Sequence, residues 1–413
     1  MSAGKEEKMR TVKSGVGYSD TTDSVAAGRQ AAEKAMTYAS AASSDFTMAF
    51  CGGNHDPFAF LRSVREVVGD GTLIGGMTVG VITNEKAGYG GYEAGVAVVS
   101  SNTISFDPIA VGRLNDGEMN AGVEFGQMMS EQSDDQTKGA LFFYDSIKSE
   151  DPFAVNLGSQ LIKGVERAFD GPHVPIVGGG VMKDYQWRGS PVFAGAEALS
   201  QHASGVLIKG DCKVHHAITH GCEPASDYHT ITSIDGPVVR ELDGRRALDV
   251  IEDIIGAGAG QDWQQYSLLV TLGANYGNDP YGDFNENEYL SRLIAGVNPE
   301  DGSLILFESD FGPGEQIQVM RRSNEQMLNS ARDVSRDLLQ EVKSEDPFLG
   351  IYIDCAGRTS GFCGAGAEEG AIVQETIGTQ MPLLGFYSGV EIAPFMGGSR
   401  ALDWTGVLVV LSE

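Results

Sequence analysis

Residues 48–82, MAFCGGNHDPFAFLRSVREVVGDGTLIGGMTVGVI, contain a strand, a helix and a short strand that ends in paired glycines. Asp56 is placed to cap the helix, and Pro57 occupies its first position, where a missing N–H loses no hydrogen bond. Apolar residues at helical spacing predict one buried helix face, and these are Phe58, Leu61, Val64 and Val68. The strand AGVAVVS at 94–100 follows, so the unit is β-α-β-β.

The same order recurs about a hundred residues later, at 140–184, as ALFFYDSIKSEDPFAVNLGSQLIKGVERAFDGPHVPIVGGGVMKD. Asp151 and Pro152 predict the start of its helix, and the expected buried face carries Phe153, Leu157, Leu161 and Val165. The strand SGVLIKG at 204–210 completes the second unit. Glycines at 75–76 and 178–180 hold matching positions, where we expect two chain segments to approach closely.

A looser third copy closes the chain, with strands at 348–355, 381–392 and 405–413 around a glycine-led helix at 364–378. Between copies two and three, residues 227–256 predict a hairpin at Asp235-Gly236 followed by a helix. Ser323 and Gln326 form a capping box that opens a long helix. The pattern predicts an α/β fold in which repeated β-α-β-β units form two mixed sheets with helices packed on their faces.

Composition excludes several classes of protein. The net charge of −28, with no basic stripe to offset it, argues against nucleic-acid binding. No apolar run long enough to cross a membrane is present, and the first residues lack a secretory signal, so we expect an acidic cytoplasmic protein without membrane insertion. The five cysteines include no CxxC pair, which favours reduced thiols over disulfides or zinc ligands.

Four motifs, HGCEPAS at 220–226, LDGRRALDVIEDI at 242–254, DCAGR at 354–358 and LLGFYSGVEIAP at 383–394, resemble the FIST domain. The resemblance divides the chain into an N-terminal half at 1–245, holding two β-α-β-β copies, and a C-terminal half at 246–413. Val390 departs from the family pattern, in which a glycine usually stands there.

The resemblance implies a sensory domain of signal transduction that binds small ligands, with amino acids as the proposed class. It also implies a partner such as a histidine kinase, a chemoreceptor or a cyclic-dinucleotide enzyme, on which this chain is expected to act in trans. Some family members bind haem and respond to nitric oxide, which is the alternative function.

Residues 354–370 predict a buried strand that runs into a glycine-rich loop and a helix, an arrangement able to bind an anion. Arg358 is placed to grip a ligand carboxylate, and Asp354 or Glu391 to receive an ammonium. Cys355 and Tyr387 belong to the same family motifs and join the expected ligand-binding set. The other interpretation is a tight structural turn whose arginine pairs with an acidic residue.

Cys355 also stands where some hydrolases hold a nucleophile, which makes a cysteine-dependent enzyme with Asp354 and Glu391 the second alternative function. No histidine occurs after His229, so a base must come from the other half. We therefore expect a binding protein and not an enzyme.

Residues 215–224, HHAITHGCEP, hold three of the seven histidines. Strand alternation points His215 and His216 to opposite faces, which disfavours a compact metal site. His220 and Cys222 share a face and complete the expected ligand-binding set, and His220 is the candidate axial ligand if haem is bound. The alternative for His220 is a half-buried cleft residue, and no metal or obligatory cofactor is expected.

Overall fold

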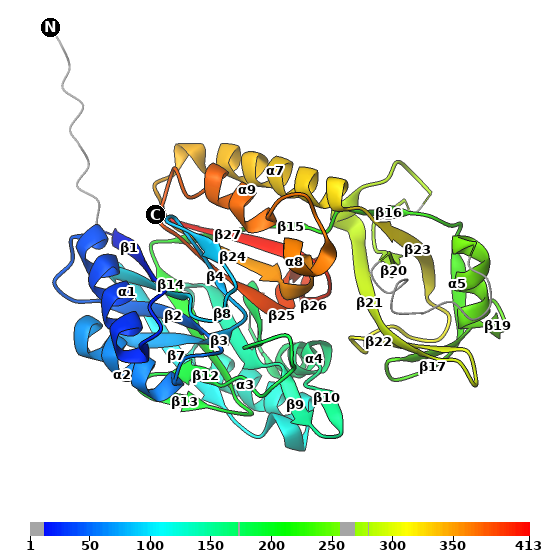
Figure 1. Cartoon of the computed structure of the whole chain (residues 1–413), viewed down its shortest axis with the longest axis horizontal. Coiled ribbons are helices and arrows are strands. Elements are labelled where there is room, and N and C mark those ends of the chain that lie inside the picture. The colour runs from blue at the N-terminus through cyan, green and yellow to red at the C-terminus, as the bar shows by residue number, and fades with distance from the viewer. Residues whose placement is uncertain (1–11, 172–173, 257–268, 280) are drawn as a thin grey trace, which may run out of the picture.

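The computed structural model describes residues 12–171, 174–256, 269–279 and 281–413, which form a larger and a smaller lobe (Figure 1). The larger lobe contains both the beginning and the end of the described chain. The smaller lobe, drawn in green to yellow, comes from its middle. No helix in these ranges is long and apolar enough to cross a membrane.

The first predicted unit comprises β2 (Phe46–Gly52), α2 (Pro57–Val68), β3 (Thr72–Thr78) and β6 (Ala94–Ser101). Asp56 Oδ1 accepts the backbone N–H of Phe58 and of Ala59, each at 2.9 Å, which confirms the predicted cap. Phe58 itself is 60% exposed, and Phe60 takes its expected place in the core. The six-stranded sheet of this unit also contains β1 (Val12–Ser19), β12 (Val192–Ala194) and β13 (Glu197–Leu199), and α1 (Ser24–Ala39) packs against α2.

The second unit keeps its strands but begins its helix later than predicted. β8 (Thr137–Asp145), α4 (Gly158–Ala168), β11 (Ile176–Val181) and β14 (Ala203–Gly210) form this unit. Asp151 and Pro152 instead make the turn between β9 (Ile147–Glu150) and β10 (Phe153–Val155). The predicted cap at Asp151 is therefore wrong, although Leu161 and Val165 are buried on α4 as expected.

The third unit comprises β24 (Pro347–Cys355), α9 (Glu369–Thr376), β25 (Leu383–Phe395) and β27 (Gly406–Ser412). Before it, α7 (Asn324–Glu341) begins where the sequence predicts, because Ser323 accepts the N–H of Gln326. Helix α7 lies beside α9, over the sheet that contains β27 and β24 (Figure 1).

Strands from both halves of the chain share one eleven-stranded sheet. Its main path runs β15 (Lys213–Thr219), β27, β24, β25, β11, β8, β14 and β7 (Ile104–Val111), with β4 (Val81–Thr83), β5 (Ala87–Gly88) and β26 (Gly398–Leu402) off this path. Within this sheet the halves are joined by three strand pairs, β11–β25, β15–β27 and β4–β25, and in the first of these Gly179 lies opposite Glu391. On the outer side of this sheet, α3 (Glu118–Gln132) packs against α4.

The repeated glycines serve the close approach that the sequence predicts. A Cβ on Gly75 would lie 1.8 Å from the carbonyl oxygen of Ala49, and one on Gly178 would lie 1.8 Å from that of Phe142.

At the centre of the larger lobe Phe50, Phe143 and Phe386 pack against one another with ring centroids 4.3 to 5.4 Å apart. One such phenylalanine comes from each copy, so the three copies share a single core.

The smaller lobe is a six-stranded barrel, which the sequence pattern does not predict. Its ring closes because β23 pairs with both β17 and β20. The expectation of two mixed sheets is therefore not confirmed, since the described residues form four sheets. The strands are β17 (His229–Asp235), β18 (Val238–Leu242), β20 (Val270–Asn275), β21 (Tyr289–Asn298), β22 (Ser303–Leu306) and β23 (Gln316–Arg322), with β16 (Cys222–Pro224) and β19 (Arg245–Arg246) added to them and α5 (Ala247–Ile255) beside them.

Candidate functional site

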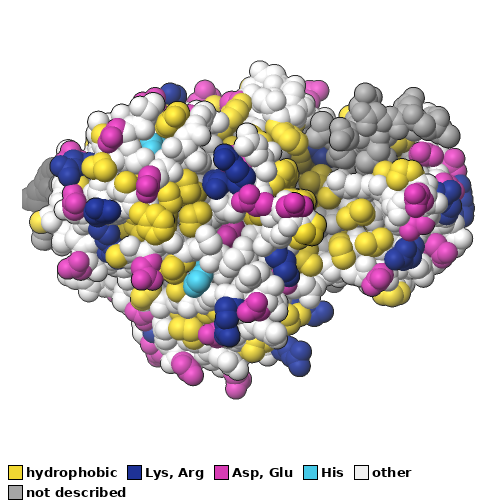
Figure 2. All heavy atoms as spheres, turned by 60° about the horizontal axis from the view of Figure 1, so that its bottom comes forward, with side chains coloured by type: hydrophobic (Ala, Val, Ile, Leu, Met, Phe, Trp, Pro, Cys, Tyr) yellow, Lys and Arg dark blue, Asp and Glu magenta, His cyan; other side chains and the backbone are white. Residues whose placement is uncertain are grey.

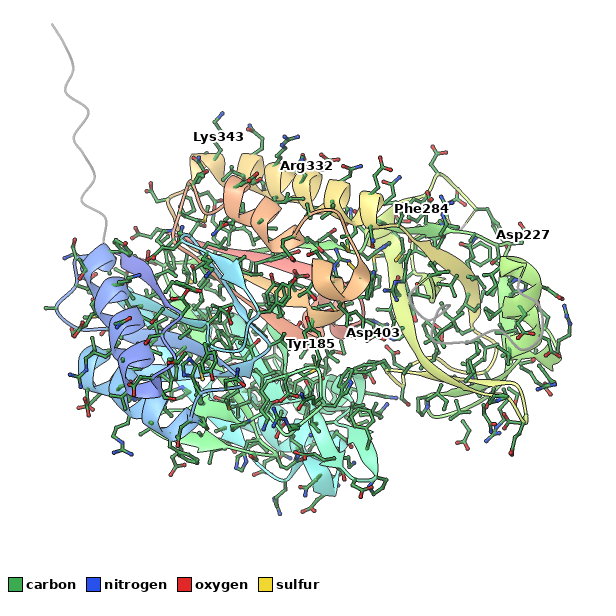
Figure 3. The ribbon with its side chains drawn as sticks, in the orientation of Figure 1. Tyr185, Asp227, Phe284, Arg332, Lys343 and Asp403 are labelled. Carbon is green, nitrogen blue, oxygen red and sulfur yellow. The ribbon has the colours of Figure 1, made fainter. Side chains whose placement is uncertain are left out.

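A cavity of about 260 Å³ lies where the barrel meets the larger lobe. Figure 3 shows Tyr185, which lines it, and Asp403, the neighbour of lining residue Trp404, at this junction. Three parts of the chain supply its walls. They are Leu293–Ala295, Phe307 and Arg322 from the barrel, Phe153, Met182, Tyr185 and Trp187 from the second unit, and Cys355–Gly357, Phe362, Ser388, Gly389 and Trp404 from the third.

Aromatic rings dominate these walls. Trp187 contacts Phe153 and Phe307, with ring centroids 5.5 and 5.7 Å away, and Tyr185 stacks on Phe362 at 5.7 Å. Phe153 and Phe362 are 54% and 46% exposed, so their rings extend from the cavity wall to the protein surface. Ligand cavities are commonly apolar with a few placed polar groups, and this one has that character.

Both cavity tryptophans have a left-handed backbone, with φ of 59° at Trp187 and 60° at Trp404. This conformation is uncommon for a bulky residue and stores strain. Such strain persists only where the surrounding structure enforces it, and it concentrates at ligand sites. The two tryptophans are therefore held in place by the fold at the cost of local backbone energy.

Among the described residues that line the cavity, Arg322 is the one with a charged side chain. Its guanidinium carbon lies 3.0 Å from the ring centroid of Trp404, a cation–π contact. Burial lowers the pKa of Arg322 to about 9, which still leaves the group charged at neutral pH.

Of the seven residues predicted to bind a ligand, Cys355 is the one that lines this cavity. It is 7% exposed, and burial raises the pKa of its thiol, so the thiol is neutral. Because no described histidine lines the cavity with it, the nucleophile interpretation finds no base here.

Arg358 does not have the role that the motif suggests. Its side chain is entirely buried, with Nε 2.7 Å and Nη2 2.6 Å from the carboxylate of Glu369. Nη1 donates to the carbonyl oxygens of His220 and Trp404. With its donors directed at the protein, Arg358 is not available to a ligand carboxylate in this structure, and it holds the turn at Ala356–Arg358 against β24.

The predicted acids lie behind the cavity. Asp354 points to the opposite sheet face from Cys355, 3.6 Å from Nε of Arg358, and burial raises its pKa. Glu391 accepts from Oγ of Ser388 at 2.6 Å and from N and Oγ1 of Thr405, and burial raises its pKa to about 8.

Tyr387 is also buried, against the ring of Tyr89, and burial raises its pKa. The third unit thus brings five of the predicted residues close together, but of these only Cys355 lines the cavity and the other four are buried behind it.

His220 does not fit a haem ligand. Its Nδ1 accepts the N–H of Cys222 at 2.9 Å, so its Nε2 carries the proton and donates to the carbonyl oxygen of Glu286, also at 2.9 Å. Both ring nitrogens are engaged, and burial lowers the pKa of the ring. Cys222 is 2% exposed with its pKa raised to about 11 by burial. Within the described ranges no three His, Cys, Asp or Glu side chains are grouped to hold a metal ion.

Sequence reasoning missed most of the cavity. The cavity residues Trp187, Phe307, Arg322 and Trp404 come from loops and strand ends that span more than two hundred residues, and no spacing relates them. The rarity of tryptophan, with three in the chain, is the one signal that points to two of these positions.

Comparison with known proteins gives two family matches and several distant relatives. The FIST N domain matches residues 45–245, and the FIST C domain matches residues 247–394. An uncharacterized protein of Mycobacterium tuberculosis (strain ATCC 25618 / H37Rv) is 24% identical over 253 residues, 59% of this chain and 62% of that protein. An uncharacterized protein of Methanocaldococcus jannaschii is 26% identical over 238 residues, 54% of this chain and 41% of that protein. The match thus spans less than two thirds of the length of these relatives.

Among solved structures, a cyanuric acid hydrolase from A. caulinodans covers 97% of this chain and 99% of its own, at 9% identity and a TM-score of 0.34. A likeness of that size carries no conclusion about activity.

Proposed function

Because the chain belongs to the FIST family, whose domains are sensory ligand-binding domains of signal transduction, we propose that the cavity at the lobe junction is its sensory site. A small ligand with an apolar body would occupy it, and the amino acids are the class that the family resemblance implies. We propose binding without catalysis, and the lack of a histidine beside Cys355 among the described residues of the cavity wall supports this.

The observation that carries this proposal is the origin of the cavity walls. Phe307 and Arg322 come from the barrel, whereas Trp187 and Trp404 come from the larger lobe. A ligand that contacts both lobes favours the arrangement in which they are docked. A ligand shifts a conformational equilibrium only through such a difference in affinity between two states.

The size of the cavity limits the ligand. A cavity of about 150 Å³ in another protein accepts benzene, so about 260 Å³ accepts one ring with a short side chain. A single amino acid or a molecule of that size fits, whereas a haem or a dinucleotide does not.

The output of the sensor is a change in how the barrel sits on the larger lobe. A signalling partner in the cytoplasm, of the histidine kinase, chemoreceptor or cyclic-dinucleotide enzyme type, would recognise one of the two arrangements. The acidic surface visible in Figure 2, where magenta carboxylates are scattered over the face shown, agrees with a charge of −28 and with a protein partner in preference to nucleic acid.

Thermal unfolding and tryptophan fluorescence with a panel of the twenty amino acids and their deaminated carboxylates test the proposal. A ligand at a hundred times its Kd stabilises the folded state by about 2.7 kcal/mol. It should also change the emission of Trp187 and Trp404, which line the cavity.

Phe307→Ala should weaken the response, whereas Phe58→Ala, the same truncation at an exposed site, should not. If no compound of the panel raises Tm or changes the tryptophan fluorescence, the proposal that this cavity is the sensory site is contradicted.

A further inference from the structure

The cavity at the lobe junction is far richer in aromatic rings than the chain as a whole. Phe, Tyr and Trp make up 8% of the sequence. Among the sixteen described residues that line the cavity, six are aromatic, and these are Phe153, Tyr185, Trp187, Phe307, Phe362 and Trp404. The rings come from both lobes, so their concentration at this point is a property of the folded protein and not of one aromatic stretch of sequence.

Two of the rings are fixed by contacts within the protein. Oη of Tyr185 lies 2.6 Å from Oγ1 of Thr359 and 3.1 Å from the carbonyl oxygen of Ala356. Trp404 is 3% exposed, and the guanidinium of Arg322 packs on its ring. Side chains that are already ordered lose little conformational entropy when a ligand arrives, so these rings form a preorganised wall.

The orientations of the rings offer a partner both faces and edges. The planes of Tyr185 and Phe362 are 11° apart, whereas the ring of Trp187 is inclined by 61° to Phe153 and by 45° to Phe307. Aromatic rings attract one another in offset-stacked and edge-to-face arrangements, which adds about two- to twelvefold in affinity per pair beyond the burial of area. A saturated ring of the same size gains area burial alone.

We infer that the ligand contains an aromatic ring, which binds among Trp187, Phe307 and Trp404. The inference rests on the proposed function of the cavity and narrows the class of its ligand. It selects the aromatic amino acids and their deaminated acids over the aliphatic ones.

Two pairs of probes that differ only in the saturation of the ring test it: phenylalanine with cyclohexylalanine, and 3-phenylpropanoate with 3-cyclohexylpropanoate. The cyclohexyl ring is the more apolar of the two, so hydrophobic burial alone predicts that it binds more tightly. Isothermal titration calorimetry on the full chain should give the opposite order, with the aromatic member of at least one pair binding at least about fivefold more tightly.

Two outcomes overturn different statements. If the saturated member of each pair binds within fivefold of its aromatic partner, or more tightly, the inference is wrong and the sensory site stays in place. An aliphatic amino acid that binds more tightly than every aromatic one has the same meaning. If none of the four probes and no compound of the wider panel binds, the proposed function fails and the inference fails with it.

Phe307→Leu removes one ring and keeps a large apolar side chain at the same position. It should lower the preference for the aromatic over the saturated probe at least about twofold, because one aromatic pair is lost. Phe58→Leu is the matched control, since Phe58 is 60% exposed on α2, away from the cavity lining, and this variant should keep the preference.

Trp187→Leu makes the same change at a half-buried ring, which maintains the test if the Phe307→Leu protein does not fold. An unchanged preference in a folded protein that carries either substitution contradicts the contact assigned to that ring.

Discussion

Glu308 of the barrel caps helix α4 of the larger lobe, and Ser159 in the first turn of that helix bonds back to the barrel. The carboxyl oxygens of Glu308 accept the N–H of Gly158 at 2.9 Å and of Ser159 at 2.8 Å. Oγ of Ser159 in turn accepts the N–H of Ser309 at 3.2 Å. Since Phe307 lines the cavity, three consecutive residues, 307–309, connect the candidate site to the start of α4.

Glu308→Ala should lower the free energy of unfolding by about 1–2 kcal/mol, because it removes the acceptor for two N–H groups at a helix start. Glu308→Gln, which retains one acceptor oxygen, should lose less. Urea denaturation followed by circular dichroism measures both changes, with the exposed Glu300→Ala as control. Equal stability of the Ala variant and the wild type would show that the cap contributes nothing.

Stability should fall as the pH rises from 6.5 to 8. Burial raises the pKa of Glu308 and of Glu391 to about 8, far above the value near 4.5 of an unfolded chain. In this window the folded state therefore binds more protons than the unfolded state, and the free energy of unfolding decreases with pH. His216 and His220, whose pKa values burial lowers, oppose the trend near pH 6.5, where the unfolded histidines are still partly protonated, and this opposition fades as the pH rises further. Denaturation at half-unit pH steps measures how the free energy of unfolding changes with pH, and Glu391→Gln should make this change smaller. A free energy of unfolding that stays constant or increases with pH would contradict the raised pKa values of the two glutamates.

Arg358→Lys should lower the free energy of unfolding and should not selectively weaken ligand binding. Lysine keeps the positive charge but cannot reproduce the two guanidinium hydrogen bonds to the fully buried Glu369, so the cost should be at most the about 3–5 kcal/mol of removing one partner of a buried pair. Arg29→Ala, which removes an exposed pair with Glu66, should change stability by less than about 1 kcal/mol. An Arg358→Lys protein of normal stability that has lost ligand binding would restore Arg358 as a ligand contact.

Iodoacetamide at pH 7.5 should leave Cys355 unmodified in the folded protein, because its thiol is 7% exposed and has a raised pKa. Peptide mass spectrometry identifies the labelled thiols, and Cys363, which is more exposed, is the internal comparison. Rapid labelling of Cys355 would indicate an activated thiol and favour the cysteine-enzyme alternative.

Protein expressed with haem available should show no Soret band, since both ring nitrogens of His220 are hydrogen-bonded within the protein. Absorption spectroscopy decides this directly. A Soret band that disappears in His220→Ala would show that the ring leaves its bonds to Glu286 and Cys222 to bind iron.

Local patterns predicted the core strands and helices of the three repeated units, because those features depend on residues close in sequence; α1, α3 and several short strands were not predicted. Asp56 caps α2 as its Asp-Pro context suggests, whereas the same pair at Asp151 forms a hairpin turn. The difference lies outside the local sequence, since α4 receives its cap from Glu308, 150 residues away. The barrel was not predicted for the same reason. Strand β23 pairs with β17 and with β20, and no local sequence pattern indicates these pairings.

The site was predicted in part. The family motif located the strand end at Cys355, which does line the cavity. It did not show that Arg358 would form a buried ion pair with Glu369, eleven residues later in the chain. Nor did it show that Arg322 would be the arginine that lines the cavity. Which of two buried arginines lines the cavity depends on packing between distant elements, and spacing along the chain does not encode it.

The pairing of β11 with β25 makes the two FIST halves inseparable. A gene fragment that stops near residue 245 would leave the backbone of Gly178–Val181 without one of the two strands it bonds to, and the ring of Phe143 without Phe386. Neither half is then a portable module that can be cloned, swapped or evolved independently, and recombination between relatives is tolerated only if it exchanges both halves together.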